Sequence, residues 1–390
     1  MTTVTLGLIA DDLTGANDTA VQFARRGWET WLALDAPTAG ARLSAMTRST
    51  QPRPGMAPGT MCCTALAVTT DSRALDNATA AKLTAGAVAQ LMDAGVDRIY
   101  LKIDSTMRGS VAGQIDGALA VWRTRHPDAS AVVCPAYPRM GRTVAGNRLF
   151  VEGQPVEQSP IGRDPLTPVL TGDMSALIPG SRHVTVDSWV ETTVSSSGRV
   201  ATIDASSDEH LSRAASAIVA AGPSVIPVGS AGLADALAAQ LNGASLLERE
   251  LPPGMRRLSD PRILIQVTSL NPVSRIQAAK LADAFPDVVI LLAPAERVGN
   301  SSVAERLGAD FAALVERQRW DVLGLIGGDG ARAALRQLNV SAIRIVDTLL
   351  EGIPFGVVVG GSADGIPIFT KAGGFGAEDA LVRAVERIRR

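Results

Sequence analysis

The sequence predicts an α/β protein of two domains, each built on a mostly parallel or mixed sheet flanked by helices. Short apolar segments alternate with longer helical segments along most of the 390 residues. That length corresponds to two or three average domains. Hydrophobic residues make up 46% of the chain and charged residues 19%, which is enough apolar material for packed cores. No apolar run is long enough to span a bilayer.

A polar segment divides the chain into its two halves. Residues 243–260 contain Pro252-Pro253-Gly254 and mixed charge, and they lack the apolar periodicity of their flanks. We therefore predict an N-terminal domain over residues 1–245 and a C-terminal domain over residues 256–390. Ligands of open α/β sheets bind at the carboxyl ends of strands, so polar residues directly after apolar segments are the candidates for function.

The N-terminal half begins with an apolar strand at residues 4–9 and a helix at 16–26 that ends before Gly27. Residues 36–60 predict a long loop, and the pattern weakens again between 141 and 200. The other elements follow the same rhythm: strands at 30–34, 65–69, 98–102, 131–134 and 225–228, and helices at 77–94, 111–125, 212–221 and 233–241.

The C-terminal half repeats the alternation of strand and helix. Its expected strands lie at 263–267, 288–292 and 322–326, with a strand or hairpin around 357–359 and 366–370. Helices are expected at 274–284, 302–319, 331–338 and at the C-terminus. No repeat of fixed period is present, so a solenoid is not expected.

Composition excludes several classes of function. The net charge is −2, which lacks the basic footprint of a nucleic-acid binder. Three cysteines and three histidines, without metal-ligand spacing, predict neither a disulfide framework nor a zinc site, and the metal ligands stay unknown. The N-terminus has no basic region of a secretory signal. We expect a cytoplasmic protein without a membrane or nucleic-acid partner, and a homodimer stays open.

Two carboxylates follow the first strand. Asp11 and Asp12 precede the first helix, where they can accept hydrogen bonds from a polyol or serve as a base. They can also simply cap the helix, although one Asp is enough for that role. A haloacid-dehalogenase phosphatase would show Asp-x-Asp at this point, which this chain lacks.

A second polar group follows the strand at 98–102. Residues 102–109 read Lys-Ile-Asp-Ser-Thr-Met-Arg-Gly, which supplies two cations and several polar groups for an acidic, hydroxylated small molecule. Thr70-Asp71-Ser72-Arg73 has the same character after the preceding strand. Arg139 and Arg142 lie in a proline-bracketed loop that could present them to an anion, or could be purely structural. The candidate substrate-binding residues are Asp11, Asp12, Arg73, Lys102, Asp104, Ser105, Arg108 and Arg142.

Three glycine-rich or polar junctions between strand and helix lie in the C-terminal half. They are residues 268–272 (Thr-Ser-Leu-Asn-Pro), 327–330 (Gly-Gly-Asp-Gly) and 371–376 (Lys-Ala-Gly-Gly-Phe-Gly). Backbone N–H groups at such junctions can bind phosphates at a helix N-terminus, and Lys371 adds a cation. A nucleotide is the ligand that three such junctions share. Neither a Walker A motif nor G-x-G-x-x-G is present.

Taken together, these motifs resemble the four-carbon acid sugar kinase family, whose members act on threonate, erythronate and 3-oxo-tetronate. The resemblance covers nearly the whole chain. It is carried by residues 10–16 (Ala-Asp-Asp-Leu-Thr-Gly-Ala), 70–73, 102–109, the loop 135–142, residues 229–233 (Gly-Ser-Ala-Gly-Leu) and 371–376. It implies an N-terminal acid-sugar domain, a C-terminal nucleotide domain and transfer of the ATP γ-phosphoryl group to a substrate hydroxyl.

The resemblance also implies roles for individual residues. Asp12, Arg73, Lys102, Asp104 and Ser105 would hold the acid sugar. The nucleotide would be held by Ser269, Gly327, Gly328, Asp329, Gly330 and Gly373. Two segments depart from the family pattern: Thr268-Ser269-Leu270-Asn271 replaces Gly-Ser-x-Ser, and Gly330 replaces a Thr or Ser.

We expect in-line transfer in the cleft between the domains, with ATP and Mg²⁺ as cofactors. Arg73 or Lys102 would anchor the substrate carboxylate, and Lys371 with the glycine loops would hold the phosphates. The catalytic carboxylate is Asp12 by first choice and Asp104 by second. Two other functions remain open: a sugar-acid-binding or sensing protein without catalysis, and a Gly-Gly-Asp-Gly kinase of the type that phosphorylates NAD or lipids.

Overall fold

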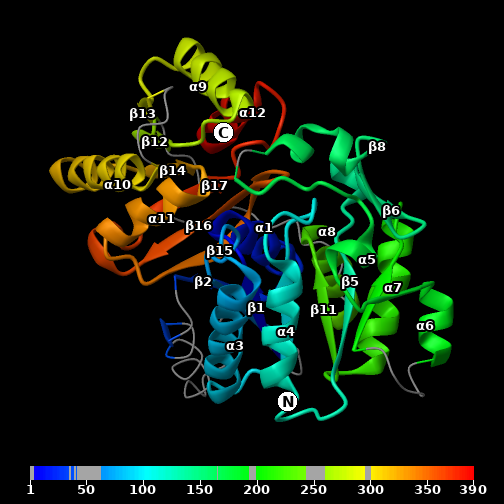
Figure 1. Ribbon diagram of the computed structural model, residues 1–390. Coiled ribbons are helices and arrows are strands. Elements are labelled where there is room, and N and C mark those ends of the chain that lie inside the picture. The colour runs from blue at the N-terminus through cyan, green and yellow to red at the C-terminus, as the bar shows by residue number, and fades with distance from the viewer. Residues whose placement is uncertain are drawn as a thin grey trace. The chain divides into compact units, whose positions relative to one another are not determined.

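The computed structural model describes residues 4–34, 37–38, 41, 63–164, 166–192, 199–242, 260–294 and 300–390 (Figure 1). The chain divides into two compact units. The first consists of residues 1–29 and 35–247, and the second of residues 30–34 and 248–390. Most of the predicted loop at 36–60 and of the predicted linker at 243–260 lies outside the described residues.

The first unit is built on a parallel sheet. The central strand β1 (Val4–Ala10) is a short apolar segment, buried beyond its first residue, as is typical of parallel strands covered on both faces. In spatial order the strands are β3 (Cys63–Thr69), β1, β4 (Arg98–Lys102), β11 (Val225–Gly229), β5 (Ser130–Cys134), β10 (Val200–Ile203) and β9 (Arg182–Val184). Every pairing among them is parallel, so their carboxyl ends share one edge.

Helices connect these strands. α3 and α4 pack against each other and run side by side in Figure 1. Their bounds, with those of the other helices, are α1 (Leu13–Ala24), α3 (Asn77–Asp93), α4 (Val111–Trp122), α5 (Met174–Leu177), α6 (Val186–Thr192), α7 (Asp208–Ala221) and α8 (Ala231–Asn242). The weakly patterned region after residue 141 forms a small antiparallel sheet of β6 (Arg142–Ala145), β7 (Arg148–Val151) and β8 (Gln154–Pro155).

The second unit is built on a mixed sheet. Its spatial order is β13 (Val289–Leu292), β12 (Ile263–Val267), β14 (Val322–Ile326), β17 (Pro367–Lys371), β16 (Ile353–Val359), β15 (Ala342–Leu350) and β2 (Glu29–Ala33). The first four strands are parallel, and β16, β15 and β2 continue the sheet in antiparallel pairs. The helices are α9 (Pro272–Ala284), α10 (Asn300–Arg317), α11 (Gly328–Gln337) and α12 (Ala380–Arg389).

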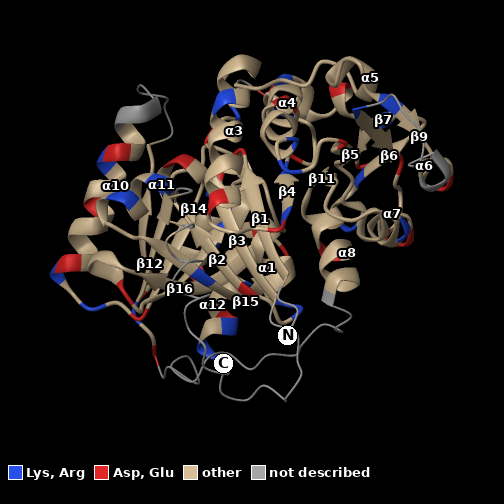
Figure 2. Ribbon diagram, turned by 90° about the horizontal axis from the view of Figure 1, so that it is seen from below, with Lys and Arg blue, Asp and Glu red and all other residues tan. Residues whose placement is uncertain are grey.

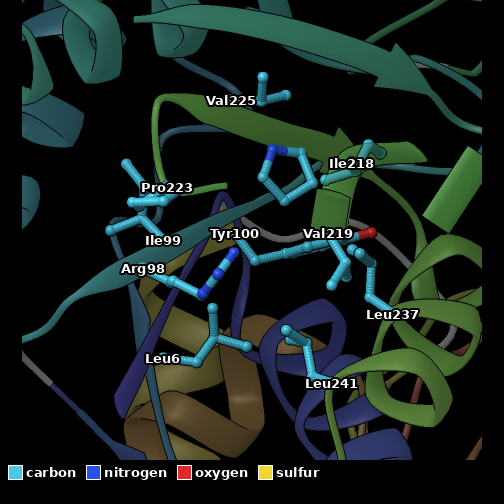
Figure 3. Close-up of a pocket in the computed structure, with 11 residues that line it drawn as sticks. Leu6, Arg98, Ile99, Tyr100, Ile218, Val219, Pro223, Val225, Leu237 and Leu241 are labelled. Carbon is cyan, nitrogen blue, oxygen red and sulfur yellow. The ribbon is translucent and has the colours of Figure 1, made fainter. Parts of the chain in front are cut away.

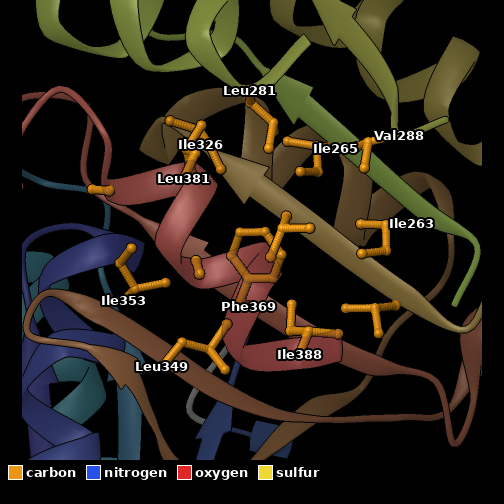
Figure 4. Packing of buried hydrophobic residues seen from close by; sticks show 14 of the residues in the cluster. Ile263, Ile265, Leu281, Val288, Ile326, Leu349, Ile353, Phe369, Leu381 and Ile388 are labelled. Carbon is orange, nitrogen blue, oxygen red and sulfur yellow. The ribbon is translucent and has the colours of Figure 1, made fainter. Parts of the chain in front are cut away.

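The core of the second unit lies between this sheet and helices α9 and α12. Phe369 of β17 is fully buried in the middle of the cluster, among Ile326, Leu381 and aliphatic residues of β12 (Figure 4). The amphipathic pattern of α12 supplies Leu381, Ala384, Val385 and Ile388 to it. This packing holds the carboxyl ends of β12, β14 and β17 next to one another, where the three polar junctions begin.

The predicted fold class is confirmed, and two details differ from the expectation. The strand predicted at 30–34 forms as β2 (Glu29–Ala33), but it pairs antiparallel with β15, from Ala342 opposite Ala33 to Ile345 opposite Thr30. It therefore belongs to the second unit instead of the first predicted domain. β15 was not expected from the sequence, and its pairing with β16 is interrupted by irregular register at Ile345/Asp347 and Thr348/Leu350.

Charged residues of both signs are interspersed along helices such as α3 and α10 in the view of Figure 2. Among the described residues, none of the helices has the length and apolar character needed to cross a membrane.

Candidate functional site

The carboxyl ends of three neighbouring strands place the N-terminal candidates together. Strand β1 lies between β3 and β4, and its last residue, Ala10, pairs with Thr69 on one side and Lys102 on the other. The chain segments that leave these strands therefore start within one or two strand spacings of each other. Asp11, Arg73 and Asp104 lie on those segments.

Arg73 connects three carboxylates. Its Nε donates to Asp11 Oδ2 at 2.7 Å, and its Nη2 donates to Asp11 Oδ1 and Asp12 Oδ1, each at 2.7 Å. Its Nη1 lies 3.5 Å from Asp104 Oδ2. Asp11 is fully buried, and the planar guanidinium meets it with two parallel hydrogen bonds. Arg73 is therefore the central cation of an acidic cluster.

Asp12 caps the first helix, which is one of the two roles that the sequence left open. Its Oδ1 accepts from the backbone N–H of Gly15 at 2.9 Å, so it caps α1, and its Oδ2 accepts from Thr14 Oγ1 at 2.5 Å. A Cβ at position 15 would lie 2.4 Å from Asp12 Oδ1 and 2.8 Å from Lys102 Nζ. Only glycine at this position lets the carboxylate and the ammonium approach each other over the helix N-terminus.

Asp104 fixes the loop after β4. It accepts from both the backbone N–H (2.9 Å) and the hydroxyl of Thr106, and from Arg108 Nη2 at 2.8 Å. Arg108 continues to Asp164, whose Oδ2 lies 3.3 Å from Arg108 Nη1. Asp164 was missed from the sequence because it lies in the region without regular pattern, and no motif marks it.

The electrostatic environment differs among the three carboxylates. Burial raises the pKa of Asp104, but Arg108 and Arg73 outweigh it and hold this pKa well below the usual range. Burial also opposes ionisation of Asp12, yet Arg73 and Lys102 lower its pKa overall. For Asp11 burial wins over Arg73 and raises the pKa. Burial opposes the positive charge of Arg73, but Asp11, Asp12 and Asp104 outweigh it and raise the pKa of this side chain, so the guanidinium stays charged.

Lys102, Arg142 and Ser105 complete the predicted set. The Lys102 ammonium is buried, donates to the Ile103 carbonyl at 2.8 Å and lowers the pKa of both Asp11 and Asp12. Arg142, at the start of β6, donates to the Met140 carbonyl. Burial lowers the pKa of Arg142, and among its neighbours Asp104 raises this pKa and Arg108 lowers it. Ser105 is half-buried in the loop between Asp104 and Thr106. The structure thus gathers the predicted residues of this half around one strand edge.

Arg139 belongs to another cluster. It pairs with Asp235 of α8, which also accepts from Arg26 Nη2 at 2.8 Å, and with Asp208 at 3.3 Å. These ion pairs connect the loop 137–141 to α8 and to Arg26, which lies just after α1. Its purely structural reading, which the sequence left open, is the one that the geometry favours.

An apolar pocket of the first unit lies away from the acidic cluster (Figure 3). It is lined by residues near the amino ends of the strands, such as Leu6, Arg98 and Val225, and by α7 and α8. Parallel strands place these ends opposite the edge that carries Asp11 and Asp104. The pocket therefore does not adjoin the candidate residues.

In the second unit the three predicted junctions pack against one another. A Cβ at Gly373 would lie 1.9 Å from Ser269 Oγ, so residues 371–376 touch residues 268–272. A Cβ at Gly330 would lie 2.2 Å from two atoms of the Thr268 side chain, so residues 327–330 touch the same segment. Three junctions that are far apart in the sequence thus form one cradle at the N-termini of α9 and α11.

The carbonyl groups of residues 372, 373, 375, 376 and 377 accept hydrogen bonds from side chains of the second unit. Lys371 Nζ donates to the carbonyls of residues 372, 373 and 375, at 2.8, 3.2 and 2.9 Å. Ser274 Oγ donates to that of residue 373 at 2.6 Å, and Gln277 Nε2 to those of residues 375, 376 and 377. A loop whose carbonyls are held inward presents its peptide N–H groups outward, which is the arrangement that binds phosphate oxygens.

The described residues contain no group of three or more His, Cys, Asp or Glu side chains arranged to hold a metal ion. Asp329 is the carboxylate of the Gly-Gly-Asp-Gly segment, and it is exposed in the first turn of α11. One such oxygen ligand fits a Mg²⁺ ion that keeps its waters and is held mainly by nucleotide phosphates.

Comparisons with known proteins distinguish the same two halves of the chain. Residues 6–237 match a family model described as a sugar-binding N-terminal domain, and residues 266–381 one described as a nucleotide-binding C-terminal domain. A D-threonate kinase of Bordetella bronchiseptica is 36% identical, over 98% of this chain and 97% of the relative. A D-erythronate kinase of Heliobacterium modesticaldum is 26% identical, over 97% and 96%.

A solved structure from Bordetella bronchiseptica, a domain-swapped dimer with bound citrate, is 36% identical, covers 100% of this chain and 99% of that chain, and has a TM-score of 0.54. The acidic cluster thus lies in the half that matches the sugar-binding model, and the three junctions lie in the half that matches the nucleotide-binding model. The chain therefore belongs to the family of four-carbon acid sugar kinases.

Proposed function

We propose that this chain is an ATP-dependent kinase that phosphorylates a hydroxyl group of a four-carbon sugar acid such as threonate. One observation carries the proposal: a cluster suited to a hydroxylated acid and a cradle suited to phosphates stand on the two halves that the sugar and nucleotide family models cover. The relatives named for threonate and erythronate support this substrate class. The citrate in the similar structure is likewise a hydroxylated carboxylate.

Lys102 is the best candidate to bind the substrate carboxylate. Arg73 uses its guanidinium on Asp11, Asp12 and Asp104, whereas the Lys102 ammonium has three donors and gives one to the Ile103 carbonyl. The arginines around it are paired: Arg73 with Asp11, Asp12 and Asp104, Arg108 with Asp104 and Asp164, and Arg142 with Glu152. An anionic substrate would therefore be met first by the Lys102 ammonium.

Asp12 is the better candidate to accept the substrate hydroxyl. Asp104 receives Thr106 and Arg108 on Oδ1, and Arg108 with Arg73 on Oδ2, so its lone pairs are occupied. Asp12 Oδ2 receives only the Thr14 hydroxyl among the described contacts, and the Asp12 side chain is 20% exposed against 9% for Asp104. The lowered pKa keeps Asp12 ionised, which suits a group that orients a hydroxyl.

The nucleotide end uses backbone rather than side chains. The outward N–H groups of residues 373, 374 and 376 and of the α11 N-terminus would bind the ATP phosphates, together with Ser269. Asp329 would be the protein ligand that helps to hold Mg²⁺, which would neutralise charge on the phosphates.

The reaction joins these two ends. The substrate hydroxyl oxygen attacks the γ-phosphorus, the bond from that phosphorus to the β–γ bridging oxygen breaks, and ADP leaves with those electrons. Asp12 orients the hydroxyl and takes up its proton as the new bond forms. In-line transfer requires the hydroxyl and the γ-phosphate to meet, so the two units must bring their ligands together during turnover. The domain-swapped dimer of the similar structure supports a homodimer as the assembly.

The experiment is a screen of four-carbon sugar acids with ATP and Mg²⁺, read by ADP release. D-threonate, D-erythronate and 3-oxo-tetronate are the first substrates, and the Asp12→Asn variant is the matched control because asparagine also caps helices. ADP release that depends on one sugar acid and is lost in the variant supports the proposal. Thermal stabilisation by a sugar acid without ADP release would instead establish the sensing protein.

A further inference from the structure

Lys371 is a buried ammonium surrounded by carbonyl oxygens. It ends β17 and is 1% exposed. All three of its donors are used, on the carbonyls of Ala372, Gly373 and Phe375 at 2.8, 3.2 and 2.9 Å. A phosphate could gain a bond from this ammonium only by displacing one of these carbonyls.

Lys371 has no carboxylate to balance it. Among the residues that the structure describes it forms no ion pair, and burial lowers its pKa to about 8. Lysine is rarely buried without a paired charge. Such a burial therefore calls for a reason beyond packing, and the carbonyls of the nucleotide cradle are what the ammonium holds.

This environment resembles a monovalent cation site. Potassium and ammonium ions bind in proteins to groups of backbone carbonyl oxygens that replace their hydration shell. Here several carbonyls of one loop converge on a single positive charge that belongs to the chain itself. Ser274 and Gln277 hold the carbonyls of the same loop from the α9 side.

We propose that Lys371 acts as a built-in monovalent cation, which holds the carbonyls of residues 372, 373 and 375 inward and so turns the N–H groups of residues 373, 374 and 376 toward the nucleotide. Lys371 is then a positioning residue: it acts on the phosphates through the loop. Nucleotide binding should consequently not depend on potassium. The part of this inference that concerns the nucleotide rests on the proposed function, whereas the holding of the loop does not.

The test replaces the internal cation by an external one. Lys371→Ala opens space beside the three carbonyls, and Lys280→Ala is the control because Lys280 is an exposed lysine of the same unit that pairs with Glu378. Each protein is compared in K⁺, NH₄⁺ and the oversized tetramethylammonium ion at constant ionic strength. The readouts are the melting temperature and the Kd for ATP by calorimetry, without sugar acid.

For Lys371→Ala in tetramethylammonium we expect ATP to bind at least about tenfold more weakly, since more than one hydrogen bond to a charged group is lost. K⁺ or NH₄⁺ should restore most of the affinity and raise the melting temperature of this variant alone. Equal ATP affinity of wild type and variant in tetramethylammonium, or weakened binding that neither ion restores, would overturn the inference.

Failure of the proposed function gives a different result. If wild type binds no ATP, the proposed function is wrong, and the ion-dependent melting temperature of Lys371→Ala still decides the inference. If Lys371→Ala does not fold, Lys371→Gln replaces it, because its neutral amide can donate to two of the carbonyls. ATP binding by Lys371→Gln that equals wild type would then overturn the inference, and binding weakened relative to Lys280→Gln would support it.

Discussion

Replacing Arg73 by Met removes the cation that three carboxylates share, two of which, Asp11 and Asp104, are buried. Methionine keeps an unbranched apolar stem of similar reach, so the change deletes charge and hydrogen bonds with little loss of packing. Arg73 makes contacts of 2.7 Å to Asp11, 2.7 Å to Asp12 and 3.5 Å to Asp104. Breaking a buried ion pair from one side costs about 3–5 kcal/mol, and we expect that loss in the free energy of unfolding near neutral pH.

The loss should depend on pH with a definite sign. Without Arg73, burial and mutual repulsion raise the pKa of these carboxylates above their unfolded values. A carboxyl with a raised pKa binds more protons folded than unfolded, so the variant gains stability as pH falls. Each titrating group contributes about 1.4 kcal/mol per pH unit, which is enough to remove roughly half of the loss between about pH 8 and about pH 5.

The assay is urea unfolding followed by tryptophan fluorescence at both pH values, with Trp122 as a fully buried reporter of the first unit. Arg148→Met is the matched control, since Arg148 forms one exposed pair with Glu157 and should lose less than about 1 kcal/mol. A loss below about 1 kcal/mol in Arg73→Met, or an equal loss at both pH values, would refute the assignment of Arg73 as the central cation of the cluster.

Three further predictions concern the two sites. Asp12→Asn should lower kcat by about 10²–10⁴ with the Kd for ATP unchanged, whereas Asp104→Asn should mainly lower the melting temperature; equal kcat losses in steady-state assays would contradict this distinction. Wild type should lose stability below about pH 4 in an acid titration followed by circular dichroism. The pKa of Asp104 is lower in the folded than in the unfolded protein, so its contribution to stability is present above the unfolded pKa and is lost as pH falls through the folded pKa. The titration would show no such loss if Asp104 were unpaired. Gly330→Thr should destabilise by about 1–3 kcal/mol, since its Cβ would lie 2.2 Å from Thr268 atoms, and adding Thr268→Gly should restore most of that; additive losses in a double-mutant cycle would be the opposite result.

The strands and their polar ends could be read from the sequence. β4, β12 and β14 have the predicted bounds, because each is a short apolar segment with polar residues on both sides. The carboxyl ends of parallel strands share one edge of the sheet. Asp11, Asp12, Lys102 and Asp104 could therefore be selected as candidates for one site without knowledge of the strand order.

Long-range pairing could not be read in the same way. β2 joins the sheet of the second unit, and its partner β15 lies near the opposite end of the chain. Local patterns hold no information on such a partner. The resulting exchange of residues 30–34 between the halves is the main difference from the predicted division at 245 and 256.

The partners of charged side chains could not be predicted from the sequence either. Arg73 or Lys102 was expected to anchor the substrate carboxylate, and either contact stays a prediction. In the structure the Arg73 guanidinium pairs with Asp11, Asp12 and Asp104. Lys371 was expected to hold phosphates directly, yet its donors are on backbone carbonyls. Residue types and spacing indicate which charges gather, whereas the partner of each charge depends on side-chain geometry.

The two departures from the family pattern have a joint physical explanation. The chain has Thr268 where the pattern has Gly, and Gly330 where it has Thr or Ser. A side chain at position 330 would collide with Thr268, so the two changes complement each other across one narrow space. The space between the two junctions is therefore filled by a side chain at position 268 instead of one at position 330.

The most direct test of the central claim is mass spectrometry of the sugar acid after incubation with ATP and Mg²⁺. The proposed function predicts that one four-carbon sugar acid gains one phosphoryl group for each ADP formed, and that Asp12→Asn abolishes this product while still binding ATP. If ATP is consumed without a phosphorylated sugar acid, or if Asp12→Asn forms the product at the wild-type rate, the account of the site is contradicted.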